Sequence, residues 1–234
     1  MRRKLLGSFL LGFIAACILL SFKIGDSFKS PIIAQVLDRK SYISAYDGRC
    51  KNPYYVYEFL DEKSIDGSVS RYGMEFKEDV NLPNIIRSNL SDYKGSGFDR
   101  GHLCPAGDCT YSKEAMIDSF YLSNISPQVP KFNRGYWKKL EEHVRTLVTE
   151  YKRLEVITGP LYLPHNELNG NRYVKYQVIG KNDVAVPTHF FKIVRSKDRT
   201  WAWILPNEEI DKSTPFIDFE VTLDKVERVS GIVF

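Results

Sequence analysis

The feature that most constrains the fold is a run of regularly spaced apolar residues between Asn133 and Arg153. They recur mostly at intervals of three and four, and they are Trp137, Leu140, Val144, Leu147, Val148 and Tyr151. Side chains at these intervals share one face of an α-helix. The pattern therefore predicts a long amphipathic helix that packs against a core, and a shorter helix is expected near residues 112–120.

Segments rich in β-branched and aromatic residues lie on both sides of this helix and predict strands. They cover residues 54–60, 156–158, 173–179, 184–194 and 200–205. Residues 61–97 are mostly polar with Gly, Pro and Asn, which favours a loop. Strands separated by loops and joined by one long helix predict a mixed α+β domain, and 234 residues allow one domain of moderate size.

The N-terminal segment has a different composition from the rest of the chain. Arg2, Arg3 and Lys4 precede eighteen uncharged residues, Leu5 to Phe22. This is close to the length of about 20 residues that spans a bilayer, and a basic start before an apolar run is also typical of signal peptides. We expect a signal peptide or membrane anchor over residues 1–22, a connector over 23–39 and the folded domain over 40–234. A buried core helix is the alternative for the apolar run.

The net charge is small, but it is unevenly distributed. The chain has 33 Lys+Arg and 29 Asp+Glu, a formal charge of +4, and Arg2 to Lys4 supply three of these positive charges. The remainder is close to neutral, which gives no support to a broadly basic nucleic-acid-binding surface. Residues 130–153 nevertheless hold seven basic and three acidic residues, whereas residues 207–227 hold two and seven. The predicted helix is thus locally positive.

The segment GSGFDRGHLCPAGD, Gly95 to Asp108, contains the first candidate for chemistry. Arg100 carries a planar fork that suits phosphate, and His102 has the one side chain whose ordinary pKa is near neutral. A structural role for a single histidine in a loop is the alternative.

Asn133 is the second candidate. It precedes Trp137 and Leu140 by four and seven residues, so we expect it to face inward with them. A buried amide requires partners. Either Asn133 caps the N-terminus of the helix, or its amide oxygen binds a hard cation such as Mg²⁺.

These motifs together resemble a known family. GSGFDRGH is followed by SN at Ser123-Asn124, by SPQ, and by N-x3-W-x2-LE from Asn133, with 22 residues from His102 to Asn124 and 31 to Asn133. The set is similar to the DNA/RNA non-specific endonucleases of the ββα-metal (His-Me finger) class, and within them to endonuclease G and its bacterial relatives. The similarity extends over residues 41–234 and implies a central antiparallel sheet with flanking helices.

The resemblance assigns roles to five residues. It implies that His102 is the general base for the attacking water and that Asn133 is the sole direct protein ligand of Mg²⁺, with Mn²⁺ as the alternative ion. It further implies that Arg100 contacts phosphate, that Asn124 orders the site, and that Glu141 holds metal-bound water.

Other positions match the family less closely. Arg71 lies 29 residues before Arg100, near the place of a transition-state-stabilising arginine, and Glu227 matches an acidic residue without a defined role. A basic run either faces nucleic acid or is a solvated helix face, and its members are Lys131, Arg134, Lys138, Lys139 and Arg145.

The function implied by the resemblance is Mg²⁺-dependent, sugar-non-specific cleavage of DNA and RNA to 5′-phosphate products. The alternatives are a catalytically inactive nucleic-acid-binding protein on the same fold and a phosphodiesterase for small nucleotides. The resemblance also suggests a homodimer. The N-terminal segment indicates an exported or membrane-anchored protein of the bacterial cell envelope, or a secreted one, and Ile14 to Cys17 resembles a lipoprotein box. A mitochondrial location is the alternative.

The cysteines leave further alternatives open. Cys104 and Cys109 follow His102 closely, but together they offer only three ligands for a zinc ion. A disulfide between Cys104 and Cys109, or one that includes Cys50, would require an oxidising compartment.

Overall fold

The computed structural model describes residues 35–234. The expected signal peptide or anchor, the lipoprotein box at Cys17 and most of the expected connector lie outside the described residues. The first strand, β1 (Gln35–Asp38), begins within the segment expected to be a connector. Across residues 35–234, no helix is both long and apolar enough to cross a membrane.

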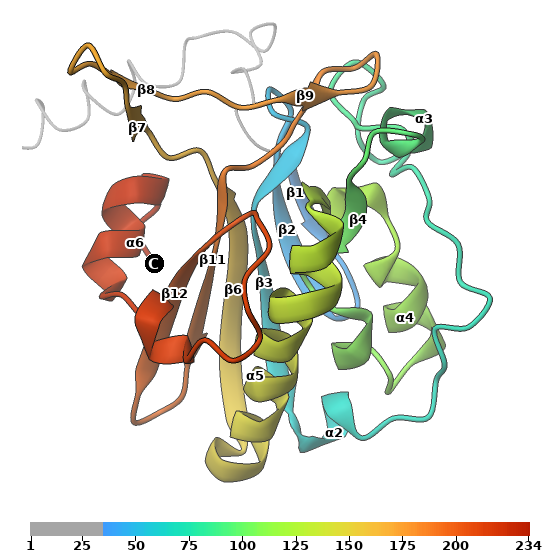
Figure 1. Ribbon diagram of the computed structural model, residues 1–234. Coiled ribbons are helices and arrows are strands. Elements are labelled where there is room, and N and C mark those ends of the chain that lie inside the picture. Colours follow the sequence, from blue (N-terminus) through green and yellow to red (C-terminus); the bar gives the residue numbers. More distant parts are fainter. Residues whose placement is uncertain (1–34) are drawn as a thin grey trace, which may run out of the picture. The chain divides into compact units, whose positions relative to one another are not determined.

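A six-stranded antiparallel sheet forms the centre of the domain (Figure 1). Its order is β1-β2-β3-β6-β11-β12, and every neighbouring pair is antiparallel. The strands after β1 are β2 (Tyr42–Asp47), β3 (Asn52–Asp61), β6 (Arg153–Leu161), β11 (His189–Arg195) and β12 (Thr200–Pro206). The strands predicted at 54–60, 156–158 and 200–205 are confirmed as parts of β3, β6 and β12.

Two predicted strands differ from the structure. Most of the strand predicted at 173–179 is absent. Only β8 (Arg172–Tyr173), paired with β7 (His165–Asn166), and β9 (Val178–Ile179) form there, because these residues are largely exposed and have no sheet to cover them. The strand predicted at 184–194 is divided into β10 (Val184–Ala185) and β11. Pro187 lies at the break, since it has no N–H to donate to a ladder.

Helices α5 (Lys138–Tyr151) and α6 (Leu223–Ser230) cover opposite faces of the sheet (Figure 1). Alternating side chains of β11 serve the two faces: Phe190 and Val194 pack with the core of α5, Phe191 and Ile193 with that of α6. Helix α6 was not predicted. Its signals are local, because Thr222 accepts a hydrogen bond from the backbone of Lys225 and Gly231 ends the helix in the left-handed conformation.

The remaining helices are short. The helix predicted near 112–120 is confirmed as α4 (Lys113–Ser119), and Ser112 caps it. Residues 61–97 are mainly loop, as expected, with single-turn helices α2 (Glu62–Ile65) and α3 (Leu90–Tyr93). Three 3₁₀ turns complete the set, and they are Ala106–Asp108, Leu122–Asn124 and Phe216–Phe219.

The long helix begins differently from the prediction. A π-helical turn, Phe132–Trp137, precedes the regular helix α5, which ends at Tyr151 before Lys152 with φ 66°. Upstream, β4 (Asp99–His102) pairs with β5 (Ile125–Gln128) in an antiparallel hairpin. The hairpin, the π turn and α5 follow one another as a ββα unit.

Candidate active site

The hairpin β4–β5 holds His102 at the end of a strand. His102 lies opposite Ile125, and the next residue, Leu103, donates its backbone N–H to the carbonyl of Asn124 at 2.9 Å. Gly101 is required here for space, because a Cβ at this position would lie 2.1 Å from Oε1 of Gln128. The DRGH motif therefore allows the two strands to pack closely beside the imidazole.

A cleft of about 680 Å³ opens in front of this hairpin. Its lining includes seven of the residues that the sequence singled out: Arg71, Arg100, His102, Asn133, Arg134, Lys138 and Glu141. Asn124, Lys131 and Glu227 do not line it. Asp99 and Arg145 complete the charged lining, which then holds five Lys or Arg side chains and two carboxylates.

His102 is enclosed by aromatic rings. Its ring centroid lies 5.3 Å from that of Phe76 and 5.0 Å from that of Phe120, and only 9% of the residue is exposed. Burial, with a smaller contribution from the charge of Arg71, lowers the pKa of His102 to about 3. The imidazole is consequently neutral at physiological pH, the state in which a histidine accepts a proton.

Asn133 lies in the π turn and faces the cleft. Its Nδ2 donates to Oδ2 of Asp99 at 2.8 Å, and no protein hydrogen bond engages its amide oxygen within the described residues. A free amide oxygen beside a carboxylate is a hard donor of the kind that Mg²⁺ accepts, so the residues present fit this ion. The alternative that Asn133 caps the helix is wrong, because the residue lies within the turn, where its own N–H is bonded to the carbonyl of Val129.

Asp99, in the DRGH motif, orients two residues of the cleft. Besides the amide of Asn133, it accepts from Nε of Arg134 at 2.8 Å and from Nη2 of the same side chain at 2.5 Å. The sequence placed Asp99 in the motif, but it gave no sign that this carboxylate reaches the start of the long helix.

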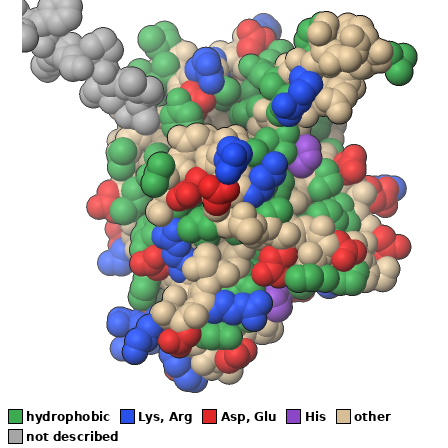
Figure 2. Space-filling view, turned by 90° about the vertical axis from the view of Figure 1, so that its left-hand side faces the viewer, with side chains coloured by type: hydrophobic (Ala, Val, Ile, Leu, Met, Phe, Trp, Pro, Cys, Tyr) green, Lys and Arg blue, Asp and Glu red, His purple; other side chains and the backbone are tan. Residues whose placement is uncertain are grey.

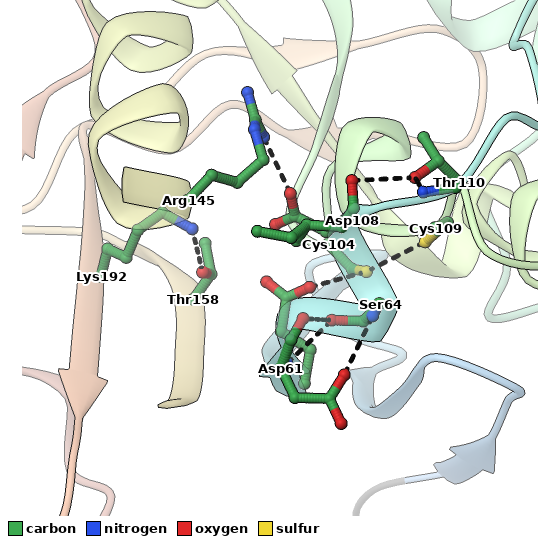
Figure 3. A network of polar contacts seen from close by, with 12 residues as sticks. Asp61, Ser64, Cys104, Asp108, Cys109, Thr110, Arg145, Thr158 and Lys192 are labelled. Carbon is green, nitrogen blue, oxygen red and sulfur yellow. Dashed lines mark hydrogen bonds and ion pairs between the residues drawn. The ribbon is translucent and has the colours of Figure 1, made fainter. Parts of the chain in front are cut away.

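Glu141 lies one turn into α5, and its charge interacts with those of Lys192, Asp108 and Arg145, the group drawn in Figure 3. Burial raises the pKa of Glu141 to about 7, against the attraction of Lys192. Lys192 is 1% exposed, and its Nζ donates to Oγ1 of Thr158 at 2.5 Å. Lys192 and the buried Glu58 were missed by the sequence analysis. The sequence signal for both residues was a charged side chain within an apolar segment that was predicted to be a strand.

Besides Arg134, three arginines line the cleft, and each is held by a neighbouring side chain. The guanidinium of Arg100 lies 4.7 Å from the ring centroid of Phe76, and that of Arg71 lies 5.7 Å from Phe120. Arg145 is bonded instead to a carboxylate, with 2.8 Å between its Nη1 and Oδ1 of Asp108 (Figure 3). Arg145 appeared in the sequence only as one member of a basic region.

Three predicted site residues lie outside the cleft lining. Asn124 is buried, and its side chain bonds the backbone N–H and carbonyl of Cys104, each at 2.9 Å, which fixes the segment after His102. Lys131 forms an exposed ion pair with Glu209 at 2.6 Å. Glu227 belongs to α6 on the other face of the sheet, where it accepts from the backbone of Phe234.

The three cysteines between residues 35 and 234, Cys50, Cys104 and Cys109, are free thiols. Cys104 and Cys109 are buried with 3.7 Å between their Sγ atoms, and Sγ of Cys104 also donates to Oε2 of Glu58. Cys50 lines a separate small cavity with Asn52 and Tyr162. No cluster of three or more His, Cys, Asp and Glu that could hold a metal occurs between residues 35 and 234, so the zinc alternative gains no support.

The charge of the cleft contrasts with that of the α6 side of the domain. Figure 2 shows that side, where basic and acidic side chains are interspersed. The cleft has an excess of positive charge, with Arg71, Arg100, Arg134, Lys138 and Arg145 facing Asp99 and Glu141. Such an excess suits a polyanionic ligand.

A neutral imidazole, an amide oxygen suited to a hard cation and a set of cations meet on a ββα unit. The fold and the cleft together define a metal-dependent nuclease of the ββα-metal class, as the motifs predicted. A family model described as DNA/RNA non-specific endonuclease matches residues 24–234. The chain therefore belongs to the DNA/RNA non-specific endonuclease family.

Individual relatives agree with this assignment. The chain is 43% identical over 209 residues to "Endonuclease G, mitochondrial" of Bos taurus, a match that covers 87% of this chain and 70% of the relative. It is 42% identical over 225 residues to "Mitochondrial nuclease" of Saccharomyces cerevisiae, with 90% and 68% covered. A crystal structure of the EndoG/EndoGI complex superimposes with a TM-score of 0.83 at 41% identity, covering 88% of this chain and 87% of that chain.

Proposed function

We propose that the chain is a Mg²⁺-dependent endonuclease that hydrolyses phosphodiester bonds of both DNA and RNA and leaves 5′-phosphates, with Mn²⁺ as the alternative ion. The observation that carries the proposal is the meeting of His102, Asn133 and five basic side chains in one cleft. Phosphodiester hydrolysis needs a base, a cation at the phosphate oxygens and a positive clamp, and this cleft offers residues for each.

His102 is the proposed general base. Its neutral ring accepts the proton of an attacking water, and the surrounding rings of Phe76 and Phe120 exclude other water from it. Arg71 lies over the ring of Phe120 and Arg100 over that of Phe76, and both would bind phosphate oxygens with their forks.

Asn133 would hold Mg²⁺ through its amide oxygen, and Glu141 would orient water around the ion. When bound, the ion supplies stabilisation of the negative charge that develops on the phosphate and on the leaving oxygen. Asp99 keeps the Asn133 amide in place through the bond to Nδ2, so the oxygen is presented to the cleft.

The cleft lining supports cleavage without sequence or sugar preference. Its charged groups are arginines, one lysine and two carboxylates, which suit phosphates and a cation rather than base edges. Contacts to the backbone alone carry no sequence information and are common to DNA and RNA.

Plasmid DNA and a structured RNA, incubated with the protein in Mg²⁺ or in EDTA, test the proposal. We expect cleavage of both substrates in Mg²⁺ only, with 5′-phosphate ends. We also expect a loss of about 10²–10⁴-fold for His102→Ala, the usual range for a removed general base, and a comparable loss for Asn133→Ala. Arg228→Ala, on α6, is the matched control and should retain full activity.

The same assay separates the alternatives. Binding of DNA without metal-dependent cleavage would favour the catalytically inactive binding protein. Turnover of mononucleotides without nicking of the plasmid would favour the small-nucleotide phosphodiesterase. Full activity of His102→Ala would reject the assignment of the base while leaving the nuclease itself intact.

Location and assembly are separate parts of the proposal. The relatives named as mitochondrial support a mitochondrial location, whereas export or anchoring depends on the composition of residues 1–22. The mass of the mature N-terminus would distinguish cleavage, lipidation at Cys17 and retention of the segment. Light scattering would test the homodimer that family resemblance suggests.

A further inference from the structure

Arg145 lines the cleft, and among the described residues it forms an ion pair with Asp108 alone. It projects from α5, and its side chain is 24% exposed. Its one side-chain bond among the described residues is the 2.8 Å contact of Nη1 with Asp108, so the rest of its fork remains free to bind phosphate.

Asp108 is built into a rigid support. It is 3% exposed and ends the 3₁₀ turn Ala106–Asp108, where its N–H bonds the carbonyl of Pro105 at 2.9 Å. The same segment begins at Cys104, whose backbone is held on both sides by the side chain of Asn124. Asp108 is therefore fixed relative to the strand end that carries His102.

Gly107 supplies the space in which the guanidinium rests. A Cβ at Gly107 would lie 3.0 Å from Nη1 and 3.3 Å from Cζ of Arg145. Because these atoms are the far end of a flexible side chain, a methyl group here would shift the guanidinium by a few tenths of an ångström and leave the backbone in place.

Burial of the Asp108 carboxylate costs free energy of folding. A residue with only a packing role would avoid this cost. Burial raises the pKa of Asp108, and the Arg145 guanidinium opposes this rise. Truncation of one partner of such a pair leaves the other charge buried and alone. An apolar residue would fill the same space without this cost, which favours a role in directing Arg145.

We infer that Asp108 and Gly107 form a seat that orients Arg145 toward the phosphates of the bound nucleic acid. Asp108 is thus a positioning residue, and it acts through Arg145 without touching substrate. The inference rests on the proposed function, because it assumes that the cleft binds a phosphodiester chain.

Single variants give the first test. Asp108→Ala should lower kcat/KM for duplex DNA about 10–100-fold, and Asp108→Asn less, because the amide oxygen still accepts from Nη1. Gly107→Ala should lower kcat/KM about 10-fold with no change of charge. The matched control is Asp92→Asn, another carboxylate that is 2% exposed; neither Asp92 nor its partner Asn182 belongs to the cleft lining. It should leave kcat/KM unchanged.

A double-mutant cycle with Arg145 shows whether Asp108 and Gly107 position this arginine or only support the fold. In an Arg145→Gln background, both Asp108→Asn and Gly107→Ala should have less than about a twofold effect, because the side chain that they orient is gone. Equal losses in both backgrounds would overturn the inference.

A readout without substrate separates this inference from the proposed function. Phenylglyoxal modification of Arg145, followed by peptide mass mapping, should accelerate in Asp108→Ala and Gly107→Ala relative to wild type, because a released guanidinium reacts faster. An unchanged rate would overturn the inference even in an active nuclease. A wild-type protein that cleaves neither DNA nor RNA would instead overturn the proposed function, whatever the modification rate.

Discussion

His102 shows at the scale of one residue how burial prepares a base. Its ring is packed between two aromatic side chains, and Arg71 adds a nearby positive charge. Both effects disfavour the imidazolium, so the ring stays neutral well below neutral pH. An unfolded chain has no such environment, and this difference makes stability depend on pH.

The first prediction concerns that dependence. The folded pKa of His102 is about 3, below the ordinary 6.5 of the unfolded chain, so the unfolded state binds the proton more tightly. Stability should be unaffected above pH 6.5 and should fall as the pH drops from 6.5 toward 3. At pH 4.5 the loss is roughly 2–3 kcal/mol, at about 1.36 kcal/mol per unit.

Urea unfolding of wild type and His102→Gln in EDTA measures this loss. The difference in unfolding free energy between the two proteins should shift against wild type by that amount between pH 7 and pH 4.5. Other titrating groups cancel in the comparison. Parallel pH profiles for the two proteins would show that the ring is not shielded as described.

A second prediction concerns the paired thiols. The Sγ atoms of Cys104 and Cys109 are 3.7 Å apart, and a disulfide requires about 2.05 Å, so only a small approach is needed. Oxidised glutathione should link them, as each thiol loses its proton and two glutathione thiols are released. Because both thiols are fully buried, the reaction should be slow.

Peptide mass mapping after alkylation identifies the bond formed. We expect one intramolecular disulfide between Cys104 and Cys109, with Cys50 alkylated as a free thiol. Cys104→Ser should abolish the disulfide, and Cys50→Ser should leave it intact. A disulfide that includes Cys50 would contradict the structure, in which Cys50 lines a cavity separate from Cys104 and Cys109.

At the scale of elements, the π turn before α5 places the metal-binding amide. A π turn has one more residue per turn than an α-turn, and such turns are frequent at functional sites. Asn133 is thereby rotated toward the cleft, while Trp137 and Leu140 remain buried in the core of the sheet. The Asn133 side chain thus points toward the cleft because of its position within the π turn, and not because of its residue type alone.

The third prediction tests this arrangement by deletion of Gly135. Removal of one residue should convert the wider π turn to an α-turn, which shifts the backbone of Asn133 by roughly 1 Å relative to the cleft. Mg²⁺-dependent cleavage should fall at least about 100-fold, because misplacement of catalytic groups costs that much. The helical circular dichroism signal should be nearly unchanged.

Gly135→Ala is the matched control for the deletion. A Cβ at this position meets only Cε of Lys212, at 3.7 Å, so the methyl group fits without displacement. This variant should keep full activity and gain a little stability, since alanine favours helices over glycine. Wild-type cleavage by the deletion variant would reject the proposed role of the π turn.

The elements also show which parts of the structure a sequence can predict. The apolar period predicted a helix over residues 133–153, and α5 (Lys138–Tyr151) confirms it, because the period of apolar residues reflects burial directly. It could not show the π turn, whose different repeat interrupts the period where Asn133 lies. The motifs indicated His102 and Asn133. The bonds from Asp99 to Asn133 and from Asp108 to Arg145 join positions 34 and 37 residues apart, and only the folded chain reveals them.

At the scale of the whole molecule, a small net charge conceals a cleft that is strongly basic. Five basic side chains line the cleft, while the α6 side mixes both signs (Figure 2). Neutralised phosphates release counterions, so log K falls with log salt by about 0.9 for each phosphate contact on B-DNA. Five contacts would give a slope of about −4.5 at most.

The last prediction tests whether the phosphate contacts are confined to the cleft. Anisotropy of a labelled duplex in EDTA, titrated between 50 and 200 mM KCl, should show a weaker salt dependence for Lys138→Gln, by about one unit of slope. Lys138 lines the cleft and is 63% exposed, and its nearest ion-pair partner, Glu142, lies 3.6 Å away.

The control variant is Arg228→Gln, which removes a comparably exposed cation on α6, one that is paired with Asp224 at 2.8 Å. It should leave the slope unchanged, because that side of the sheet makes no phosphate contact. Equal reductions for both variants would mean that binding is spread over the surface and that the cleft alone does not account for recognition of nucleic acid.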